Sequence, residues 1–370
     1  MNSKVLRKEN FGGLLFDQKT GKTIVLDKSS VCKFEDDNII AEEKYKSLFH
    51  STLSAPTRIF LAITKKCNLQ CTHCSSDSGI KENQYLSFTT LKKLLIEFKE
   101  MGVFEISLNG GEPTMHPDFF RLCKFIKELN FPLFINSNGV YSKDQLHRLA
   151  KSNIDIIKIS LAGLEKTNDS IRGNGTFKET IASIEYLKKT QNNVKINFTL
   201  TRTNLVDIFN MIDLANSLSC DIKIAPLVKV GRGKNLSERE ISPLEGIKLK
   251  KEIYSYLTQS NIKIKVEIAS GMVTNSCLGQ DDFSNFKYSP CGMSRLHLSI
   301  NSDGKAYCSG RQTDNINSVG NIYFHDFAEI WNQAQIYSKE ISDSCGKCDD
   351  SQLTQKLIHS IENKKDIPKE

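Results

Sequence analysis

The strongest constraint on the fold is an alternation of short apolar, β-rich runs with helical segments, which begins at residue 58. Between the runs, apolar residues recur at helical spacing, as in Leu91, Leu94, Leu95 and Phe98. Strands that alternate with helices pair in parallel and are joined by right-handed crossovers. The sequence therefore predicts a parallel sheet, either an open or partial (β/α) barrel or a doubly wound sheet. The six expected strands are 58–63, 103–108, 132–135, 156–161, 194–200 and 221–227.

Capping residues mark the start of several expected helices. Ser87 can cap the helix that follows it, since a hydroxyl oxygen accepts from a free backbone N–H in the first turn. Ser142 with Gln145, and Thr176 with Glu179, both fit the spacing of a capping box. We expect helices to begin at these positions.

The N-terminal region departs from the alternation. Residues 14–16 and 23–26 are typical of the two arms of a β-hairpin, and Gly21 can adopt positive φ in the turn between them. A short helix is expected near 41–49.

The chain is expected to have five parts. The predicted fold is α/β, a partial (β/α)6 TIM-like barrel with an N-terminal β-hairpin segment and a small cysteine-rich C-terminal α+β domain. The linker after the barrel would hold a helix at about 243–258 and a strand near 261–268. In chain order the parts are the hairpin segment (1–55), the barrel (56–235), the linker helix and strand (236–275), the cysteine-rich domain (276–350) and a polar tail (351–370).

Composition and charge narrow the possible functions. The net charge of +7 is spread over 370 residues without a Lys/Arg block, so we expect no nucleic-acid partner. The N-terminus lacks the apolar stretch of a secretory signal, and no run approaches the roughly 18 apolar residues of a membrane span. We therefore expect a cytoplasmic protein with no membrane partner. In that compartment, eleven cysteines indicate metal binding or catalysis rather than disulfides.

Three of these cysteines, Cys67, Cys71 and Cys74, directly follow the first expected strand. Parallel α/β folds place their active sites at that edge of the sheet. Three thiolates can bind three irons of a 4Fe–4S cluster, which normally takes four, so one iron would keep an open coordination position. The alternative is a zinc site, although zinc sites favour paired C-x2-C knuckles.

This C-x3-C-x2-C spacing after the first strand resembles the hallmark of the radical S-adenosylmethionine (SAM) superfamily. The resemblance implies that the open iron chelates the amino and carboxylate groups of SAM. One electron from the cluster would then cleave the sulfonium to give a 5′-deoxyadenosyl radical, which abstracts hydrogen from a substrate. His73 occupies the family position for a ring near the adenine.

Further motifs extend the resemblance over about residues 58–230. Gly110 to Pro113 looks like the family's GGEP motif, which binds the SAM amino group, and the glycines allow close backbone approach. The turn at 136–139 is similar to the family's T/S-N-G turn. Ala162 departs from the aspartate of many relatives. The residues that the resemblance assigns to SAM are His73, Gly110, Gly111, Glu112, Pro113, Asn138, Ser160 and Arg172.

A second cysteine set, Cys291, Cys308, Cys345 and Cys348, offers four thiolates and thus closed ligation. Its surroundings resemble the SPASM/Twitch extensions of radical SAM enzymes. The shorter Twitch type, with one auxiliary 4Fe–4S cluster, fits because no cysteine follows Cys348. The turn Asp303-Gly304 would form a hairpin that brings Cys291 towards Cys308. A four-cysteine zinc ribbon is the alternative.

No catalytic side chain is assigned from the sequence. Cys277 is left over, and it could ligate a metal, donate a hydrogen atom to a substrate radical, or simply lie in a loop.

The N-terminal hairpin, with residues 5–9 before it, resembles the opening of peptide-recognition elements, which bind a leader peptide by strand addition. Alternatively, the hairpin closes the open side of the barrel. Gly231-Arg232-Gly233 is similar to the G-R-A segment of enzymes that mature ribosomally made peptides.

These resemblances favour a peptide substrate, such as one that receives a cross-link, with flavodoxin or ferredoxin as a typical reductant. The alternatives are a small-molecule dehydrogenase or decarboxylase of cofactor or haem synthesis, or a non-catalytic zinc-binding scaffold.

Overall fold

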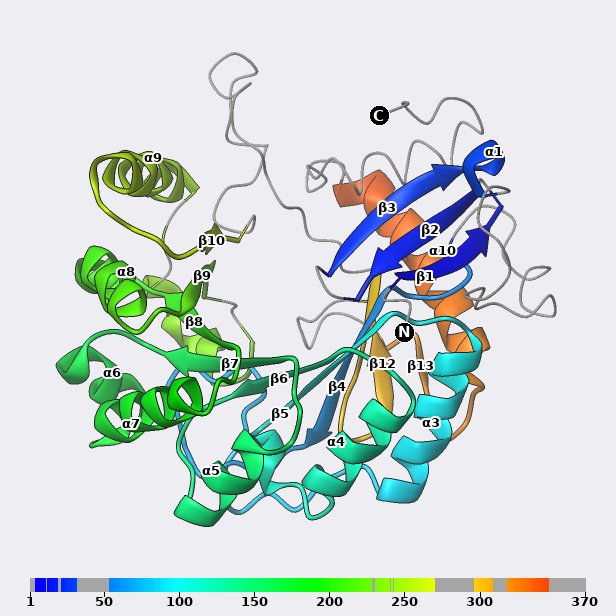
Figure 1. Cartoon of the computed structure of the whole chain (residues 1–370), viewed down its shortest axis with the longest axis horizontal. Helices are drawn as coiled ribbons and strands as arrows, with labels where there is room; N and C mark the ends of the chain where they lie inside the picture. Colours follow the sequence, from blue (N-terminus) through cyan, green and yellow to red (C-terminus); the bar gives the residue numbers. More distant parts are fainter. Residues whose placement is uncertain are drawn as a thin grey trace.

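A computed structural model describes most of the chain (Figure 1). The described residues are 4–10, 12–18, 21–31, 53–227, 230–239, 241, 243–269, 296–308 and 318–345. They contain two sheets, one of three antiparallel strands near the N-terminus and one of ten strands.

Six parallel strands form the centre of the large sheet and lie side by side in sequence order. An unbroken order means that every crossover moves the chain in the same direction, as in a barrel, whereas a doubly wound sheet reverses once. The prediction of a partial barrel is therefore confirmed and the doubly wound alternative is excluded. The strands are β4 (Arg58–Thr64), β5 (Glu105–Gly110), β6 (Leu133–Ser137), β7 (Ile156–Leu161), β8 (Val194–Leu200) and β9 (Asp221–Pro226).

Helices cover the outer face of these strands (Figure 1). Alternate strand residues such as Ile59, Leu61 and Ile63 are fully buried in the core that includes residues of the outer helices. The residues between them face the lumen. The connecting helices are α3 (Phe88–Glu100), α4 (Phe119–Glu128), α5 (Lys143–Ala150), α6 (Glu165–Arg172), α7 (Thr176–Lys189) and α8 (Ile208–Ser217).

The capping predictions are largely confirmed. Ser87 accepts from the Thr90 backbone N–H (3.1 Å), and Ser142 with Gln145 forms a full capping box. The box predicted at Thr176 is wrong, because Thr176 is the first residue of α7 and the cap is a glycine. The Thr176 hydroxyl instead donates to the Gly173 carbonyl oxygen (2.8 Å).

The C-terminal part extends the barrel sheet rather than forming a sheet of its own. After η4 (Gly231–Arg239) and α9 (Pro243–Gln259), β10 (Val266–Ile268) pairs in parallel with β9. At the other flank, β11 (His297–Ile300) pairs in parallel with β4. Two antiparallel strands and a helix follow, β12 (Lys305–Tyr307), β13 (Gly320–Asn321) and α10 (Phe327–Cys345).

The predicted Asp303-Gly304 hairpin joins β11 to β12. Gly304 has φ +83° and donates its N–H to the Asn301 carbonyl oxygen (2.9 Å). The limits of the five predicted parts of the chain stay predictions.

The N-terminal hairpin is part of a three-stranded sheet. The two predicted arms are β2 (Gly12–Asp17) and β3 (Lys22–Asp27), and β1 (Lys4–Glu9) pairs with β2 on the other side. A short helix, α1 (Lys28–Val31), follows. The helix expected near 41–49 lies outside the described residues.

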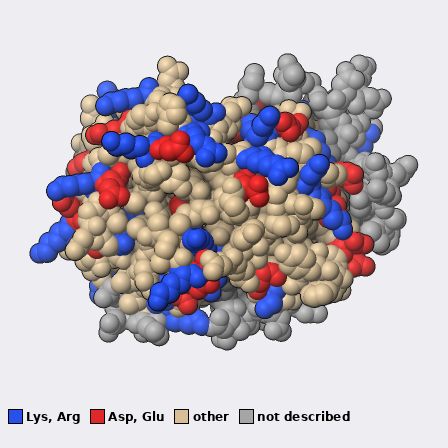
Figure 2. Space-filling view, turned by 90° about the horizontal axis from the view of Figure 1, so that it is seen from below, with Lys and Arg blue, Asp and Glu red and all other residues tan. Residues whose placement is uncertain are grey.

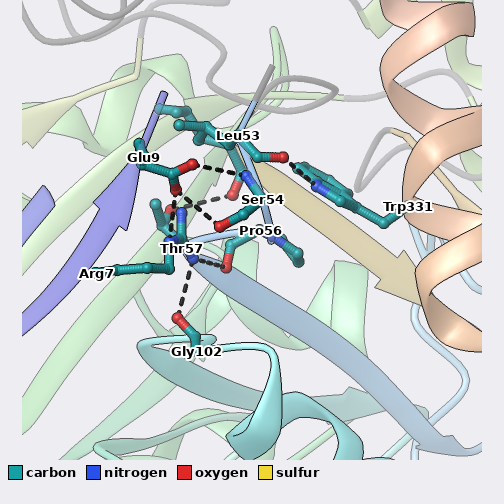
Figure 3. A network of polar contacts seen from close by, with 9 residues as sticks. Arg7, Glu9, Leu53, Ser54, Pro56, Thr57, Gly102 and Trp331 are labelled. Atoms are coloured by element: carbon teal, nitrogen blue, oxygen red, sulfur yellow. Dashed lines mark hydrogen bonds and ion pairs between the residues drawn. The ribbon is translucent and has the colours of Figure 1, made fainter. Parts of the chain in front are cut away.

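This sheet packs on the barrel through a buried ion pair at the N-terminal edge of the strands (Figure 3). Arg7 Nε lies 2.7 Å from Glu9 Oε1, and both side chains are almost fully buried. Arg7 Nη1 donates to the carbonyl oxygens of Pro56 (3.1 Å) and Gly102 (2.9 Å). The Ser54 N–H donates to Glu9 Oε2 (2.9 Å). The network therefore joins β1 to the linker before β4 and to the turn before β5.

Helix α10 reaches the same region (Figure 3). The Trp331 indole N–H donates to the Leu53 carbonyl oxygen (2.8 Å), and Phe327 packs against Phe98 of α3 with ring centroids 4.5 Å apart. The N-terminal and C-terminal segments thus share one anchoring site on the barrel.

Surface charge is mixed on the face shown in Figure 2, where basic and acidic side chains are interspersed. The exposed ion pairs of the molecule include Lys178 with Glu165 (2.9 Å) and Arg202 with Glu245 (2.7 Å). None of the helices in the described ranges combines the length and apolar content that a membrane span requires.

Candidate active site

The loop that carries Cys67, Cys71 and Cys74 follows β4 at the C-terminal edge of the barrel, as predicted. Backbone hydrogen bonds fix both parts of the loop. The Cys67 N–H donates to the Gly79 carbonyl oxygen (3.0 Å), and the Thr72 N–H donates to the Ile171 carbonyl oxygen of α6 (3.0 Å). The barrel therefore holds the three thiols in place through its own backbone.

All three thiols are free; Cys67 is buried, and Cys71 and Cys74 are partly exposed. Burial raises the pKa of Cys67 to about 11, although N–H groups of Leu69 (3.4 Å) and Asn138 (3.7 Å) donate to its sulfur. Burial also raises the pKa of Cys71, against the opposing effect of Arg172. These thiols would become thiolates on binding a cation, so they fit a metal centre.

The three thiols are not gathered as a site for a single metal ion. Within the described residues, no three His, Cys, Asp or Glu side chains gather as ligands of one metal ion. Thiolates that bind three different irons of one cluster stand farther apart than the ligands of one zinc ion.

Gly110 and Gly111 lie where the end of β5 contacts the start of this loop. A Cβ atom on Gly110 would lie 2.3 Å from the Thr64 carbonyl oxygen, and one on Gly111 would lie 2.3 Å from that of Lys66. The glycines therefore allow backbone to pack on backbone. The Glu112 N–H completes this contact by donating to the Lys66 carbonyl oxygen (2.8 Å).

The Glu112 carboxylate is fully buried and points to the turn after β6. It accepts from the Ser137 hydroxyl (2.9 Å), the Asn138 N–H (2.8 Å) and the Thr114 hydroxyl (2.7 Å). Burial raises the pKa of Glu112. Its side chain thus ties two predicted motifs together, while Pro113 begins the short helix η2 (Pro113–Met115).

Arg172 lies at the end of α6 with its guanidinium buried over the ends of β6 and β7. It donates to the carbonyl oxygens of Ser160 and Asn138. Burial lowers the pKa of Arg172, and the neighbouring Cys71 opposes this effect. The structure therefore brings Arg172, Asn138 and Ser160 together beside the cysteine loop. At Ala162, the backbone N–H donates to Asn168 Oδ1 (3.0 Å).

No role was predicted for Arg232 from the sequence. In the structure, Arg232 holds the cysteine loop through hydrogen bonds to the loop backbone. Its N–H donates to the Cys74 carbonyl oxygen (2.9 Å) and its Nε to that of Cys71 (2.8 Å). Its Nη1 also pairs with Asp77 (2.8 Å). A Cβ on the preceding Gly231, which has φ +55°, would lie 2.5 Å from the Cys74 carbonyl oxygen. The Gly-Arg-Gly motif was the available signal.

Two buried nitrogen atoms at this loop have no hydrogen-bond partner among the described residues, His73 Nδ1 and Arg232 Nη2. Burial lowers the pKa of His73 to about 4, and the charges of Arg172 and Arg232 add to this effect, so the ring is neutral near pH 7. Buried polar atoms normally have partners. Unpartnered atoms beside free thiols indicate a site that a ligand completes.

A cavity of about 640 Å³ opens between the cysteine loop and the C-terminal hairpin. One wall is the loop at Ser75 to Ser78, with Gly110 at the end of β5, and the other wall is the hairpin at Asn301 to Lys305. The C-terminal hairpin thus forms part of a cavity beside the cysteine loop, which is lined by loop residues other than the three cysteines.

The second predicted cysteine set is only partly described. Cys308, at the end of β12, is buried, and its thiol donates to the Ala334 carbonyl oxygen (3.4 Å). Burial raises the pKa of Cys308 to about 12. Cys345 is the last residue of α10. Cys277, Cys291 and Cys348 lie outside the described residues, so their joint ligation stays a prediction.

Comparisons with known proteins agree with this geometry. Residues 61–215 match the model of the radical SAM superfamily. Mycofactocin maturase MftC of Mycobacterium tuberculosis is 26% identical over 324 residues, which cover 81% of this chain and 77% of that protein. The AdoMet-dependent heme synthase of Methanosarcina barkeri is 26% identical over 335 residues, covering 80% and 89%.

Solved structures show the same fold. Streptococcus suis SuiB bound to precursor peptide SuiA superposes with a TM-score of 0.76 at 18% identity, covering 94% of this chain and 92% of that one. The matched domain spans β4 to α8 and contains the cysteine loop, the glycine motif and Arg172. The chain therefore contains a radical SAM superfamily domain, and its relatives include enzymes of that superfamily.

Proposed function

We propose that the chain cleaves SAM reductively at a 4Fe–4S cluster held by Cys67, Cys71 and Cys74. The carrying observation is that three free thiols lie on one loop, which β5, α6 and Arg232 brace from separate sides. When bound and reduced, the cluster supplies the electron that splits SAM into methionine and a 5′-deoxyadenosyl radical.

Residues of this chain would bind and orient SAM around that loop. The free Nδ1 of His73 is available to the adenine, and the backbone of the Gly110–Pro113 segment to the amino group. Arg172 would supply positive charge for the SAM carboxylate, since a guanidinium pairs well with that group. Asn138 and Ser160 hold Arg172 in place through their carbonyl oxygens.

The proposed substrate is a ribosomally made peptide, from which the enzyme abstracts hydrogen. A relative named as a mycofactocin maturase, and the fold shared with a protein solved with its precursor peptide, support this choice. The cavity beside the loop is the proposed reaction site. The N-terminal sheet has two edge strands, β1 and β3, to which a leader peptide could add as a further strand.

Cys291, Cys308, Cys345 and Cys348 are proposed to hold one auxiliary 4Fe–4S cluster. Flavodoxin or ferredoxin would deliver the electron, and the protein would act in the cytoplasm. Iron and sulfide analysis of the Cys308→Ala variant tests the auxiliary centre. We expect it to keep one cluster and lose the other.

The test of the peptide reaction uses the iron-loaded protein without oxygen, with dithionite, SAM and the short peptides encoded beside its gene. We expect 5′-deoxyadenosine and a peptide that has lost hydrogen, with fragmentation locating the change. An unchanged mass calls for a deuterium-oxide reaction, which detects epimerisation. If 5′-deoxyadenosine forms while every peptide stays unchanged in both solvents, the peptide assignment is wrong.

A second candidate is a small-molecule decarboxylase or dehydrogenase. The similarity to AdoMet-dependent heme synthase, over 80% of this chain, favours keeping it. Porphyrin carboxylates incubated with the same reduced enzyme would lose carbon dioxide if this candidate is correct.

A further inference from the structure

The lower half of the barrel lumen holds charged side chains that the proposed SAM site does not use. They lie on strands from both flanks of the sheet and on strands between them. Arg58 pairs in register with Glu105 and His297, so these three residues share one face. The set comprises Arg58 (β4), Glu105 (β5), Lys158 (β7), Lys195 (β8), Asp221 and Lys223 (β9), Glu267 (β10) and His297 (β11).

A shared aromatic ring shows that these side chains converge inside the barrel. Arg58 on β4 and Lys158 on β7 both lie 5.4 Å from the ring centroid of Phe134 on β6. β4 and β7 lie on opposite sides of β6 in the sheet. Their side chains reach the same ring most readily on the concave face of the curved sheet, which is the inside of the barrel. The lumen therefore places Arg58 and Lys158 around a common aromatic wall.

Most of these cations form ion pairs with carboxylates of the same set, but one cation does not. Arg58 Nε donates to Glu105 Oε2 (2.7 Å), Lys223 pairs with Glu267 (2.7 Å), and Lys195 pairs with Asp221 (3.0 Å). Burial and the nearby cations lower the pKa of His297 well below its ordinary value, so it is neutral near pH 7. Within the described residues, Lys158 makes no hydrogen bond or ion pair.

A second lumen group also lacks a partner. Ser299 pairs in register with Phe60 and so faces the lumen like Arg58. It is only 6% exposed, and its hydroxyl has no hydrogen-bond partner among the described residues. A buried hydroxyl without a partner is costly, so it indicates a site that a polar ligand fills.

We propose that Lys158 binds a carboxylate of the substrate inside the barrel lumen, below the cysteine loop, and that Ser299 offers a further donor to the same substrate. That the substrate is a peptide rests on the proposed function; the carboxylate can come from its C-terminus or from an acidic side chain. Lys158 would thereby select which end or residue of the peptide reaches the cavity.

The charge of Lys158 depends on pH within the working range. Burial and the charges of Arg58 and Lys223 lower the pKa of Lys158 to about 8, against the attraction of Glu105 and Glu267. The amine is therefore charged below about pH 8, and carboxylate binding should weaken as the pH rises above that value. His297, neutral throughout, does not change this dependence.

The direct test is trace acetylation of the iron-loaded, unaltered protein, with each lysine followed by peptide mass spectrometry. Probes at tens of millimolar are acetyl-glycylglycine, its C-terminal amide and N-acetylaspartic acid amide. We expect at least one of the two carboxylate probes to lower the acetylation of Lys158 about threefold or more. The C-terminal amide of acetyl-glycylglycine, which has no carboxylate, should have no effect. Protection by acetyl-glycylglycine identifies a C-terminal carboxylate as the ligand. Protection by N-acetylaspartic acid amide identifies an acidic side chain.

Three outcomes would overturn the assignment: no protection by either carboxylate, equal protection by the amide, or protection by SAM alone. None of these readouts needs SAM cleavage, so the inference can fail while the proposed function stands. If SAM cleavage failed while a carboxylate probe still protected Lys158, the proposed function would be wrong and this inference would stand.

Variants give a second measurement with the modified peptide, once that peptide is identified. Lys158→Gln should raise its KM about tenfold or more, because a charged hydrogen bond is lost, and Lys158→Arg should restore part of the affinity. The matched control is Lys195→Gln, which lies opposite Lys158 on β8 but pairs with Asp221 (3.0 Å). Equal KM changes in Lys158→Gln and Lys195→Gln would contradict a specific role.

Discussion

Each end of the barrel holds a buried arginine, and their partners differ. Arg7, at the N-terminal edge, has the carboxylate of Glu9 at 2.7 Å (Figure 3). Arg172, at the C-terminal edge, has carbonyl oxygens and the neighbouring Cys71, and no carboxylate within ion-pair distance among the described residues. The protein supplies a carboxylate counter-ion for Arg7, and we propose that a ligand supplies one for Arg172.

The difference matches what each edge does. In (β/α) barrels the C-terminal edge carries chemistry and the N-terminal edge carries stability. A buried charge that already has its counter-ion fixes how the N-terminal sheet sits on the barrel. We propose that the buried charge without a carboxylate partner, which lies beside free thiols, binds an anionic group.

Arg7→Met should give the largest effect. It leaves the Glu9 carboxylate buried without its counter-ion, which typically costs about 3–5 kcal/mol in the free energy of unfolding. Urea unfolding followed by circular dichroism measures this cost. The double variant Arg7→Met/Glu9→Leu should recover most of the loss, since it removes both charges. An equal loss in the double variant would show that the ion pair is not the cause.

Arg172→Met should act on activity more than on stability. We expect SAM cleavage to fall about 100-fold, because the site loses a charged donor aimed at its ligand, and the free energy of unfolding to fall less than for Arg7→Met. The rate of 5′-deoxyadenosine formation measures the first effect. Arg202→Met, which removes an exposed ion pair, is the control. An unchanged cleavage rate in Arg172→Met would show that Arg172 does not act on SAM, and the proposed difference between the two edges would be wrong.

Gly231→Ala tests how tightly the Gly-Arg-Gly segment holds the cysteine loop. The new Cβ would meet the carbonyl oxygens of Cys74 and Ser75 at 2.5 Å, so the loop must shift. We expect about a tenfold loss of SAM cleavage, a smaller effect than removing Arg172. Gly175→Ala is the matched control, since it also has positive φ but has open space around it. Similar losses in both variants would point to backbone strain alone.

The smallest effect concerns pH. His116 is buried, with Nε2 2.8 Å from the Leu86 carbonyl oxygen, and burial lowers its pKa. The unfolded chain binds this proton near pH 6.5, whereas the folded chain resists it. Stability from this group is therefore complete above about pH 6.5 and falls as the pH drops below that value. Urea midpoints between pH 5 and 8 should show a shallower acid slope in His116→Gln; an identical slope would refute this.

Local patterns predicted the parts of this molecule that depend on neighbouring residues. Periodicity predicted the six barrel strands. The cysteine and glycine motifs predicted the position of the cysteine loop at the edge of the sheet. Ser142 with Gln145 behaved as its spacing predicts. These features succeed because strand alternation, capping and tight backbone packing are short-range effects.

Contacts between distant segments could not be predicted in this way. β11 lies beside β4, although more than 230 residues separate Leu296 from the Thr57 that it contacts. Arg232 reaches Cys71, which lies 161 residues earlier in the sequence. The Glu112 carboxylate accepts from the Asn138 N–H, a contact between two motifs that lie 26 residues apart in the sequence. Such partners depend on the closed geometry of the barrel, which no local pattern encodes.

The central claim is that the cysteine loop is the catalytic centre, and one measurement tests it most directly. The iron-loaded protein is reduced without oxygen, given SAM and assayed for 5′-deoxyadenosine, beside Cys71→Ala and a core-cysteine control, Cys123→Ala. We predict product from the unaltered chain and the control, and none from Cys71→Ala. Full SAM cleavage by Cys71→Ala, or none by a fully loaded unaltered chain, would contradict the account.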